Sequence, residues 1–447
     1  MTDGGKRDLV SIDDLGNDEI LALFERADRF QENLKAWSAL CPGSILATLF
    51  FEPSTRTRLS FESAMLRLGG GVISATQGPM TSAAKGESLA DTARVVGGRY
   101  ADLIVLRHGD EGAARVVARF AEVPVVNAGD GAHEHPTQTL CDLYTLWREK
   151  GSLEGLEVVL CGDLKYSRTI HSFAYALARF GGRIACVPFP GMEIPDHVLR
   201  RLERRWGARV ERVGIGDLKG LVPRQDAIYI TPGKPHQQSL FLGREDLRPE
   251  HIDAVYMTRS QRERHGEEDL DEGYPSLGPR TLSEGPLKEA RVMHPLPRVD
   301  EISYDLDRDP RALYFRQAAL GVPIRMALLA FLLGKIELGV PAFRPERPAV
   351  YLSDLGIRCR NPKCITVREG RRYLSPEFWI LEDLPPLLQC VFCGWEERPL
   401  FVAHKESRIL HRGNSPEARR IRPDRRVYFL DPESAREAGF GRETETV

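Results

Sequence analysis

The sequence predicts two α/β domains with parallel sheets flanked by helices, followed by a small C-terminal β domain. From about Leu9 to Gly334, short apolar runs alternate with segments of helical periodicity, and this alternation is typical of parallel sheets covered on both faces. That stretch, roughly 325 residues long, exceeds what one such sheet usually organises, so we expect two. Beyond it, four of the eight cysteines lie within 35 residues, which indicates a separate small domain.

Composition narrows the classes of function. The chain has 447 residues, with 62 Lys and Arg against 64 Asp and Glu, and this near balance argues against a protein that coats nucleic acid. Hydrophobic residues make up 42%, enough to build cores and to exclude general disorder. The most apolar run, Met326–Leu333, has eight residues, whereas a membrane span needs about 20. We therefore expect a cytoplasmic protein without membrane or nucleic-acid partners.

Apolar runs bounded by turn residues mark the expected strands, and apolar side chains spaced i, i+3, i+4 and i+7 mark the helices between them. Strands are expected at 44–51, 103–106, 124–126, 158–161, 183–187, 227–230 and 254–257, and helices around 61–68, 140–147, 170–177 and 324–331. In chain order we expect a first domain at 9–150 completed by a helix at 312–338, a second domain at 151–311, a linker at 339–350, a cysteine-rich domain at 351–404 and a basic tail at 405–447.

The sharpest motif is Ser54-Thr55-Arg56-Thr57-Arg58, which directly follows an apolar strand and precedes a helix. The N–H groups at the start of a helix, with the positive end of the helix dipole behind them, form a ready anion site. Three hydroxyls add donors, and Arg56 can add a bidentate fork. The motif therefore predicts binding of a phosphate or a similar dianion. The alternative is an ordinary helix cap with two surface arginines.

A histidine marks a second helix start. His135 stands directly before Pro136, and proline suits the first position of a helix. The positive end of the helix dipole disfavours imidazolium there, so we expect a neutral imidazole that can donate one hydrogen bond. The alternative is a capping histidine that contacts no ligand.

Four cysteines form two paired knuckles, Cys359-x4-Cys364 and Cys390-x2-Cys393. Zinc prefers four thiolates in a closed tetrahedral structural site. The alternative is four buried free thiols, but a segment this small rarely packs so without a metal. Because four protein ligands leave no position for a catalytic water, we expect a structural zinc.

The motif at 54–58, preceded by Phe-Phe-Glu-Pro, resembles the carbamoyl-phosphate motif of the aspartate/ornithine carbamoyltransferase family. Five further matches follow in the family's order between residues 9 and 338, at 106–108, 135–140, 162–169, 256–261 and 294–298. Two features resemble the aspartate branch. Pro295 stands where the ornithine enzymes carry a cysteine, and Arg259, together with Arg168, suits a dicarboxylate substrate.

This resemblance implies transfer of the carbamoyl group from carbamoyl phosphate to L-aspartate in de novo pyrimidine biosynthesis, with no catalytic cofactor. It assigns catalysis to Arg56, Thr57, Arg107 and His135. It assigns carbamoyl-phosphate binding to Ser54, Thr55, Arg56, Thr57, Ser82, Arg107, His135, Gln138, Leu296 and Pro297. It assigns aspartate binding to Lys85, Arg168, Arg259 and Gln261. The alternatives are a carbamoyltransferase for another amino acid and a non-catalytic scaffold paralogue.

The polar loop at 81–89 resembles the family loop that reaches into a neighbouring subunit's active site. It implies a homotrimer with shared sites, alone or paired into a dimer of trimers, and the alternative is an ordinary surface loop. Residues 231–251, beside the expected aspartate site, look longer than the matching stretch of shorter family members.

The cysteine-rich domain resembles the zinc domain of the aspartate carbamoyltransferase regulatory chain, which places zinc on Cys359, Cys364, Cys390 and Cys393. About twenty residues separate the last catalytic helix from Cys359, so the nucleotide-binding domain of that chain is missing, and we expect a module for assembly or stability. The tail faintly resembles the small metal-binding domain of Ada-type repair proteins without its cysteines, so we expect a small packed appendage or a solvated basic surface. The alternative is a partner-binding role. The remaining cysteines, Cys41, Cys141, Cys161 and Cys186, are expected in the cores.

Overall fold

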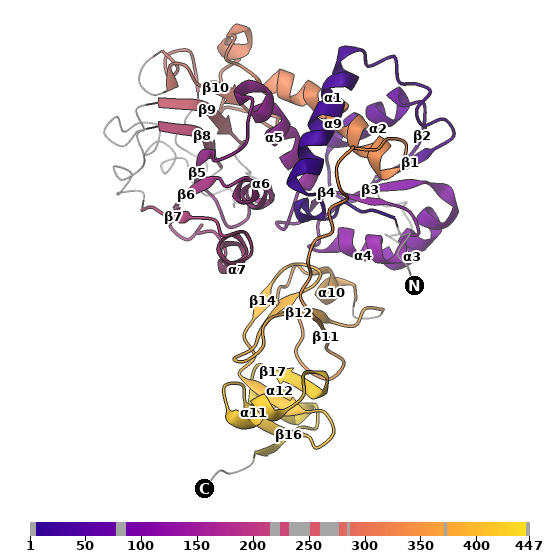
Figure 1. The fold of residues 1–447 in the computed structure, drawn as a ribbon, viewed down its shortest axis with the longest axis vertical. Coiled ribbons are helices and arrows are strands. Elements are labelled where there is room, and N and C mark those ends of the chain that lie inside the picture. Colours follow the sequence, from indigo (N-terminus) through magenta and orange to yellow (C-terminus); the bar gives the residue numbers. More distant parts are fainter. Residues whose placement is uncertain are drawn as a thin grey trace.

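The computed structural model of the chain describes residues 6–76, 86–214, 224–231, 251–259, 277–283, 287–370 and 373–443. Figure 1 shows two α/β halves side by side, with two smaller β modules stacked beneath their junction. The orange linker descends from the junction to the first of these modules. The predicted fold class, two parallel α/β sheets followed by a C-terminal β region, is confirmed.

The first half contains a four-stranded parallel sheet in the order β2-β1-β3-β4. Its strands are β1 (Ile45–Phe50), β2 (Gly71–Thr76), β3 (Leu103–His108) and β4 (Val125–Asp130). Its helices are α1 (Asn17–Glu32), α2 (Thr55–Arg67), α3 (Leu89–Val95), α4 (Ala113–Phe120) and α5 (Pro136–Lys150), with the short turns η1 (Ile12–Asp14) and η3 (Val96–Tyr100). Parallel pairing brings the carboxyl ends of β1, β3 and β4 to one edge, where open α/β sheets bind ligands.

The second half contains a six-stranded parallel sheet in the order β10-β9-β8-β5-β6-β7. Its strands are β5 (Glu157–Gly162), β6 (Arg183–Pro188), β7 (Val210–Arg212), β8 (Arg224–Ile230), β9 (His251–Met257) and β10 (Arg291–Met293). Its helical segments are α6 (Arg168–Arg179), α7 (Asp196–Arg200), η4 (Arg201–Arg205) and η10 (Tyr304–Arg308).

Helix α9 (Tyr314–Leu332) returns from the second half and packs on α1, α2 and α5 of the first. Within the part of the chain that the structure describes, it is the one helix long and apolar enough to cross a membrane by length and composition. However, 67% of that apolar window is buried inside the molecule, as in the core helix of a globular domain. Its apolar side chains join one large core shared with α1, α5 and α6.

The first C-terminal module is an antiparallel sheet of β11 (Val350–Leu352), β12 (Glu377–Glu382), β13 (Leu387–Cys390) and β14 (Glu396–Glu397), with helix α10 (Ile365–Arg368). The second module has strands β15 (Phe401–His404), β16 (Ile409–Arg412), β17 (Arg426–Phe429) and β18 (Arg442–Glu443), and helical segments α11 (Pro416–Arg420), η12 (Pro423–Arg425) and α12 (Pro432–Glu437). Strand β15 pairs with β16 and β17, so it groups with the tail although we assigned residues up to 404 to the cysteine-rich domain. Around Phe429 and Phe440 the tail packs a small core of its own.

In the described residues of the two α/β halves, every expected strand is present, and three further strands, β2, β7 and β10, were not expected. Strand β2 lies at a sheet edge with mostly exposed side chains, so its sequence lacks a buried strand's apolar run. Strands β7 and β10 have three residues each, too few for a periodic signal. The four cysteines expected in the cores are buried.

Candidate active site

A cavity of about 650 Å³ lies between the two halves, at the carboxyl ends of β1, β3, β5 and β9. Most of the predicted site residues line it together: Ser54, Arg56, Thr57, Arg107, His135, Gln138, Arg168, Arg259, Leu296 and Pro297. Thr55 lines an adjoining recess with Ser54. Ser82, Lys85 and Gln261 lie outside the described residues, as do positions 232–250 of the long segment.

The predicted anion motif forms the start of helix α2, with Ser54 as its N-cap. The Ser54 side chain makes no capping hydrogen bond to the helix, so the hydroxyl does not serve as an ordinary cap. Partial burial and the like charge of Arg259 both lower the pKa of Arg56. A bound dianion would relieve this repulsion between two arginines, because an opposite charge stabilises the cationic form.

Glu52 links two of the predicted site arginines. Its Oε2 lies 3.0 Å from Arg107 Nη2 and 2.9 Å from Arg168 Nη2. Arg168 also donates to the carbonyl oxygen of Gly131 at 2.8 Å, which fixes its guanidinium in the lining of the cavity. We did not predict Glu52 as a site residue, although it belongs to the Phe-Phe-Glu-Pro run before the anion motif. An acidic residue at that strand end is the signal that could have identified it.

His135 is the N-cap of α5, and Pro136 occupies the first turn as expected. His135 is 5% exposed, and its backbone N–H donates to Ser172 Oγ at 2.9 Å. Burial, followed by the nearby charges of Arg168 and Arg107, holds the pKa of His135 well below its ordinary value. The neutral imidazole agrees with our expectation, but its causes are burial and neighbouring arginines, whereas we had invoked the helix dipole.

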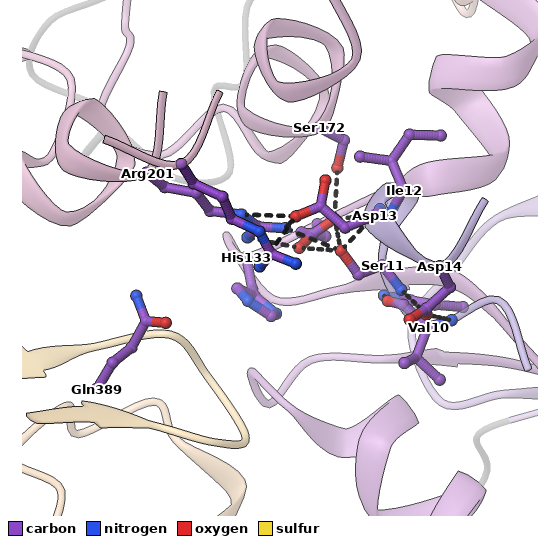
Figure 2. A network of polar contacts seen from close by, with 12 residues as sticks. Val10, Ser11, Ile12, Asp13, Asp14, His133, Ser172, Arg201 and Gln389 are labelled. Carbon is purple, nitrogen blue, oxygen red and sulfur yellow. Dashed lines mark hydrogen bonds and ion pairs between the residues drawn. The ribbon is translucent and has the colours of Figure 1, made fainter. Parts of the chain in front are cut away.

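A buried polar network lies next to the start of α5 (Figure 2). Glu134 accepts hydrogen bonds from Ser11 Oγ at 2.8 Å and from the backbone N–H of Ile12 at 3.1 Å. Arg201, in the second half, donates to Glu134 Oε1 at 3.1 Å and to Asp13 Oδ2 at 2.6 Å. The network thus ties the N-terminal segment, the residue before His135 and the second half together.

The four clustered cysteines lie in the first C-terminal module, where all four Sγ atoms are within 4.8 Å of one another and buried. Cys359 Sγ lies 3.6 Å from Cys393 Sγ, and Cys364 Sγ lies 3.9 Å from Cys390 Sγ. A tetrahedral ion about 2.3 Å from each sulfur would hold them about 3.8 Å apart. The donor set and its spacing therefore fit one metal ion.

Three segments match known domains. Residues 7–148 match the domain described as aspartate/ornithine carbamoyltransferase, carbamoyl-P binding, and residues 245–332 match the Asp/Orn binding domain of the same family. Residues 352–398 match the metal binding domain of the aspartate carbamoyltransferase regulatory chain. The catalytic subunit of aspartate carbamoyltransferase from Thermococcus onnurineus is 45% identical over 337 residues, covering 74% of this chain and 98% of that relative.

The chain belongs to the aspartate/ornithine carbamoyltransferase family. The corresponding subunit of Methanopyrus kandleri is also 45% identical, over 336 residues, covering 75% of this chain and 99% of its own length. These relatives are aspartate carbamoyltransferases, so the predicted aspartate branch and enzyme class are confirmed.

Solved carbamoyltransferase structures agree with this assignment. The catalytic subunit from M. jannaschii is 41% identical with a TM-score of 0.59, covering 73% of this chain and 98% of that one. The Trypanosoma cruzi enzyme in complex with N-(phosphonacetyl)-L-aspartic acid is 33% identical with a TM-score of 0.58, covering 73% of this chain and 95% of that one. The predicted fusion of a carbamoyltransferase chain with a metal-binding domain of the regulatory-chain type is also confirmed.

The metal-binding module docks onto the carbamoyl-P half of the same chain. The backbone N–H of Glu111 donates to the carbonyl oxygen of Lys363, and the N–H of Ile365 donates to the carbonyl oxygen of Glu111, both at 2.9 Å. Asn361 Nδ2 adds a bond of 2.6 Å to Glu111 Oε2. Strand β3 carries Arg107, and the loop that follows it is therefore hydrogen-bonded directly to the module.

The same module also contacts the Asp/Orn half. Glu396 on β14 lies 2.5 Å from Arg200 Nε on α7, and Glu382 on β12 pairs with Arg204. The ring centroids of Trp395 and His197 lie 6.3 Å apart. The metal-binding module therefore bridges the two halves of the carbamoyltransferase unit on the side where α4 and α7 lie (Figure 1).

Proposed function

We propose that the chain transfers the carbamoyl group of carbamoyl phosphate to the α-amino group of L-aspartate, as a step of de novo pyrimidine synthesis. The observation that carries this proposal is the single cavity that Arg56, Arg107, Arg168 and Arg259 line together with His135. Two anionic substrates must meet there, and four guanidinium groups supply the positive charge that both need. No covalent intermediate is required, because holding the two reactants together supplies much of the rate.

The residues divide the reaction between them. The start of α2, with Ser54, Thr55, Arg56 and Thr57, holds the phosphate. Thr57, Arg107 and the neutral His135 donate hydrogen bonds to the carbonyl oxygen, which gains negative charge as the amine attacks the carbonyl carbon. The C–O bond to phosphate then breaks, phosphate leaves with the electron pair, and the proton that the amine loses passes to the departing phosphate.

The remaining predicted residues bind the acceptor, aspartate, and the rest of carbamoyl phosphate. Arg168 and Arg259 take the carboxylates of aspartate, together with Lys85 and Gln261. Gln138, Leu296 and Pro297 hold the amide of carbamoyl phosphate, and Ser82 adds a phosphate ligand. In this scheme Glu52 neutralises Arg107 and Arg168 until the substrates bring their own negative charge.

We further propose a homotrimer with shared active sites, alone or paired into a dimer of trimers. Large apolar side chains on α2 and the edge strand β2 support it: Leu59 is 50% exposed, Leu66 60% and Ile73 40%. Large exposed apolar side chains on neighbouring elements are typical of a subunit interface. A monomer that kept full activity at high dilution would contradict the shared site.

We propose that the four-cysteine cluster holds a structural zinc ion and that the module serves assembly or stability. Four thiolates satisfy tetrahedral zinc completely, and the metal would contribute on the order of 10 kcal/mol to folding of so small a module. Buried thiols that remain reduced also suit a cytoplasmic location, which we propose on that ground.

The decisive assay measures carbamoyl transfer from carbamoyl phosphate to a panel of amino acids, with Arg56→Ala as the control. We expect turnover with aspartate and a loss of about 10²- to 10³-fold in kcat for the variant. Exclusive turnover of another acceptor would show a different carbamoyltransferase. Absence of turnover, in a folded protein that also fails to bind N-(phosphonacetyl)-L-aspartate, would favour a scaffold.

A further inference from the structure

Asp142, a buried carboxylate one helical turn after Gln138 on α5, has no part in the scheme above. The residue is 1% exposed and lies behind the cavity wall. Its Oδ1 accepts hydrogen bonds from Gln138 Nε2 and Gln317 Nε2, both at 2.8 Å. The hydroxyl of Tyr256 lies 3.1 Å from each carboxylate oxygen. These three donors come from α5, α9 and β9, so one carboxylate joins elements of both halves.

Each donor leads to a segment that forms the cavity. Gln138 and Gln317 line it themselves. Gln317 Oε1 also accepts the backbone N–H of His294 at 2.9 Å, which anchors the loop that carries Leu296 and Pro297. Tyr256 stands two residues before Thr258 and three before Arg259 on the strand that ends at the cavity.

The carboxylate also determines which end of the Gln138 side-chain amide, the NH₂ group or the oxygen, is directed toward the cavity. An ionised carboxylate only accepts hydrogen bonds, so it selects the NH₂ group of the amide and excludes the oxygen. With Nε2 held by Asp142, the Gln138 oxygen is turned away from the carboxylate and is free to accept an N–H. A carbamoyl NH₂ offers that donor.

We propose that Asp142 is a positioning residue. It orients the Gln138 amide and fixes the 294–297 loop and the end of β9 relative to that amide. This inference rests on the proposed function, since it assigns the carbamoyl NH₂ as the group that Gln138 accepts.

The charge state of Asp142 gives a readout that a merely structural residue would lack. Burial, opposed by its hydrogen bonds to Gln138, Gln317 and Tyr256, raises the pKa of Asp142 to about 7. Protonation would replace the charge-assisted hydrogen bonds from Gln138 and Gln317 by weaker neutral ones, so the network is strongest when the carboxylate is ionised.

The other titratable groups around Asp142 do not titrate near neutral pH. Burial raises the pKa values of Tyr256, Tyr229 and Cys141, which moves these groups further above neutral pH. We therefore assign to Asp142 any weakening of carbamoyl-phosphate binding as the pH falls below about 7, which is the acid limb of the pH profile.

The test compares Asp142→Asn with wild type and with Asp28→Asn. Asp28 is a matched control, because it accepts from Tyr144 and Arg148 on the same helix α5 but touches none of these cavity-lining residues. Calorimetry of carbamoyl-phosphate binding and steady-state kinetics are measured from pH 5.5 to 9. For Asp142→Asn we expect about 10- to 100-fold loss in kcat, weaker carbamoyl-phosphate binding and no acid limb. Asp28→Asn should keep the wild-type limb and kinetics.

A second variant keeps the inference testable if Asp142→Asn does not fold. Tyr256→Phe removes one hydrogen bond that lowers the Asp142 pKa, so the acid limb should move to higher pH. Wild-type kinetics, binding and acid limb in either folded variant would overturn the positioning role. Because binding is measured without an acceptor, this outcome is distinct from failure of aspartate turnover, which would instead overturn the proposed function.

Discussion

Gly112 offers a precise perturbation of the contact between the metal-binding module and the carbamoyl-P half. It is the N-cap of α4 and adopts a left-handed conformation with φ of +86°. A Cβ at this position would lie 2.7 Å from the carbonyl carbon of Phe392 and 2.8 Å from its oxygen. Phe392 stands between Cys390 and Cys393 in the second knuckle, so the obstructing atoms are backbone that cannot rotate away.

The cost of Gly112→Ala follows from these two facts. An L side chain in the left-handed region costs about 1–2 kcal/mol, and inserting a methyl group into a packed site costs about 1–3 kcal/mol. Only the steric clash with Phe392 opposes docking, so its cost of about 1–3 kcal/mol corresponds to a docking equilibrium weaker by roughly 5- to 140-fold at about 1.4 kcal/mol per factor of ten. The backbone strain instead lowers the stability of the carbamoyl-P half, whether the module is docked or not. The module should therefore detach while both parts remain folded.

Hydrogen exchange reports this detachment at named amides. The N–H groups of Glu111 and Ile365 are hydrogen-bonded across the interface, so their protection from exchange should fall in metal-loaded Gly112→Ala. The control is Gly109→Ala on the same loop, where a Cβ meets nothing within 4 Å. Metal content should remain unchanged in both variants, since no thiol is altered. Wild-type protection of both amides in Gly112→Ala would refute the steric reasoning.

Three further predictions concern single groups. The His135 imidazole should show no titration in its NMR shifts between pH 5.5 and 8, because its pKa is held well below the ordinary value; a midpoint near 6.5 would contradict this. Burial opposes the charged form of His133, but Asp130, Glu134 and Glu111 together raise its pKa. The contribution of this charge to stability is therefore fully present below pH 6.5 and is lost as pH rises through the folded pKa. His133→Gln should therefore lower the melting temperature more at pH 6 than at pH 9, and an equal loss at both would disprove the linkage. Cys390→Ser should release the metal and unfold the first C-terminal module, measured as metal content and proteolysis of residues 351–398; a variant that keeps stoichiometric metal would show that the cluster is not the ligand set.

Local signals in the sequence located most of the cavity. The anion motif at 54–58 could be recognised because strand, hydroxyls and helix start are contiguous in the chain. Likewise, His135 before Pro136 indicated a helix start, and the two cysteine pairs indicated one metal cluster. The apolar runs predicted the buried strands because a parallel sheet covered on both faces needs such runs.

Contacts between distant segments were decided only by the tertiary structure. The partners of Glu52, namely Arg107 and Arg168, are separated from it by 55 and 116 residues, and no local pattern reports such a pairing. Asp142 looked like one more polar residue on an amphipathic helix until folding placed Gln317 and Tyr256 against it. The sequence by itself determined which chemical groups the protein carries and the elements that bear them. Their charge states and partners depend on burial and on charges brought close by the packing of the two halves, and these exist only in the folded chain.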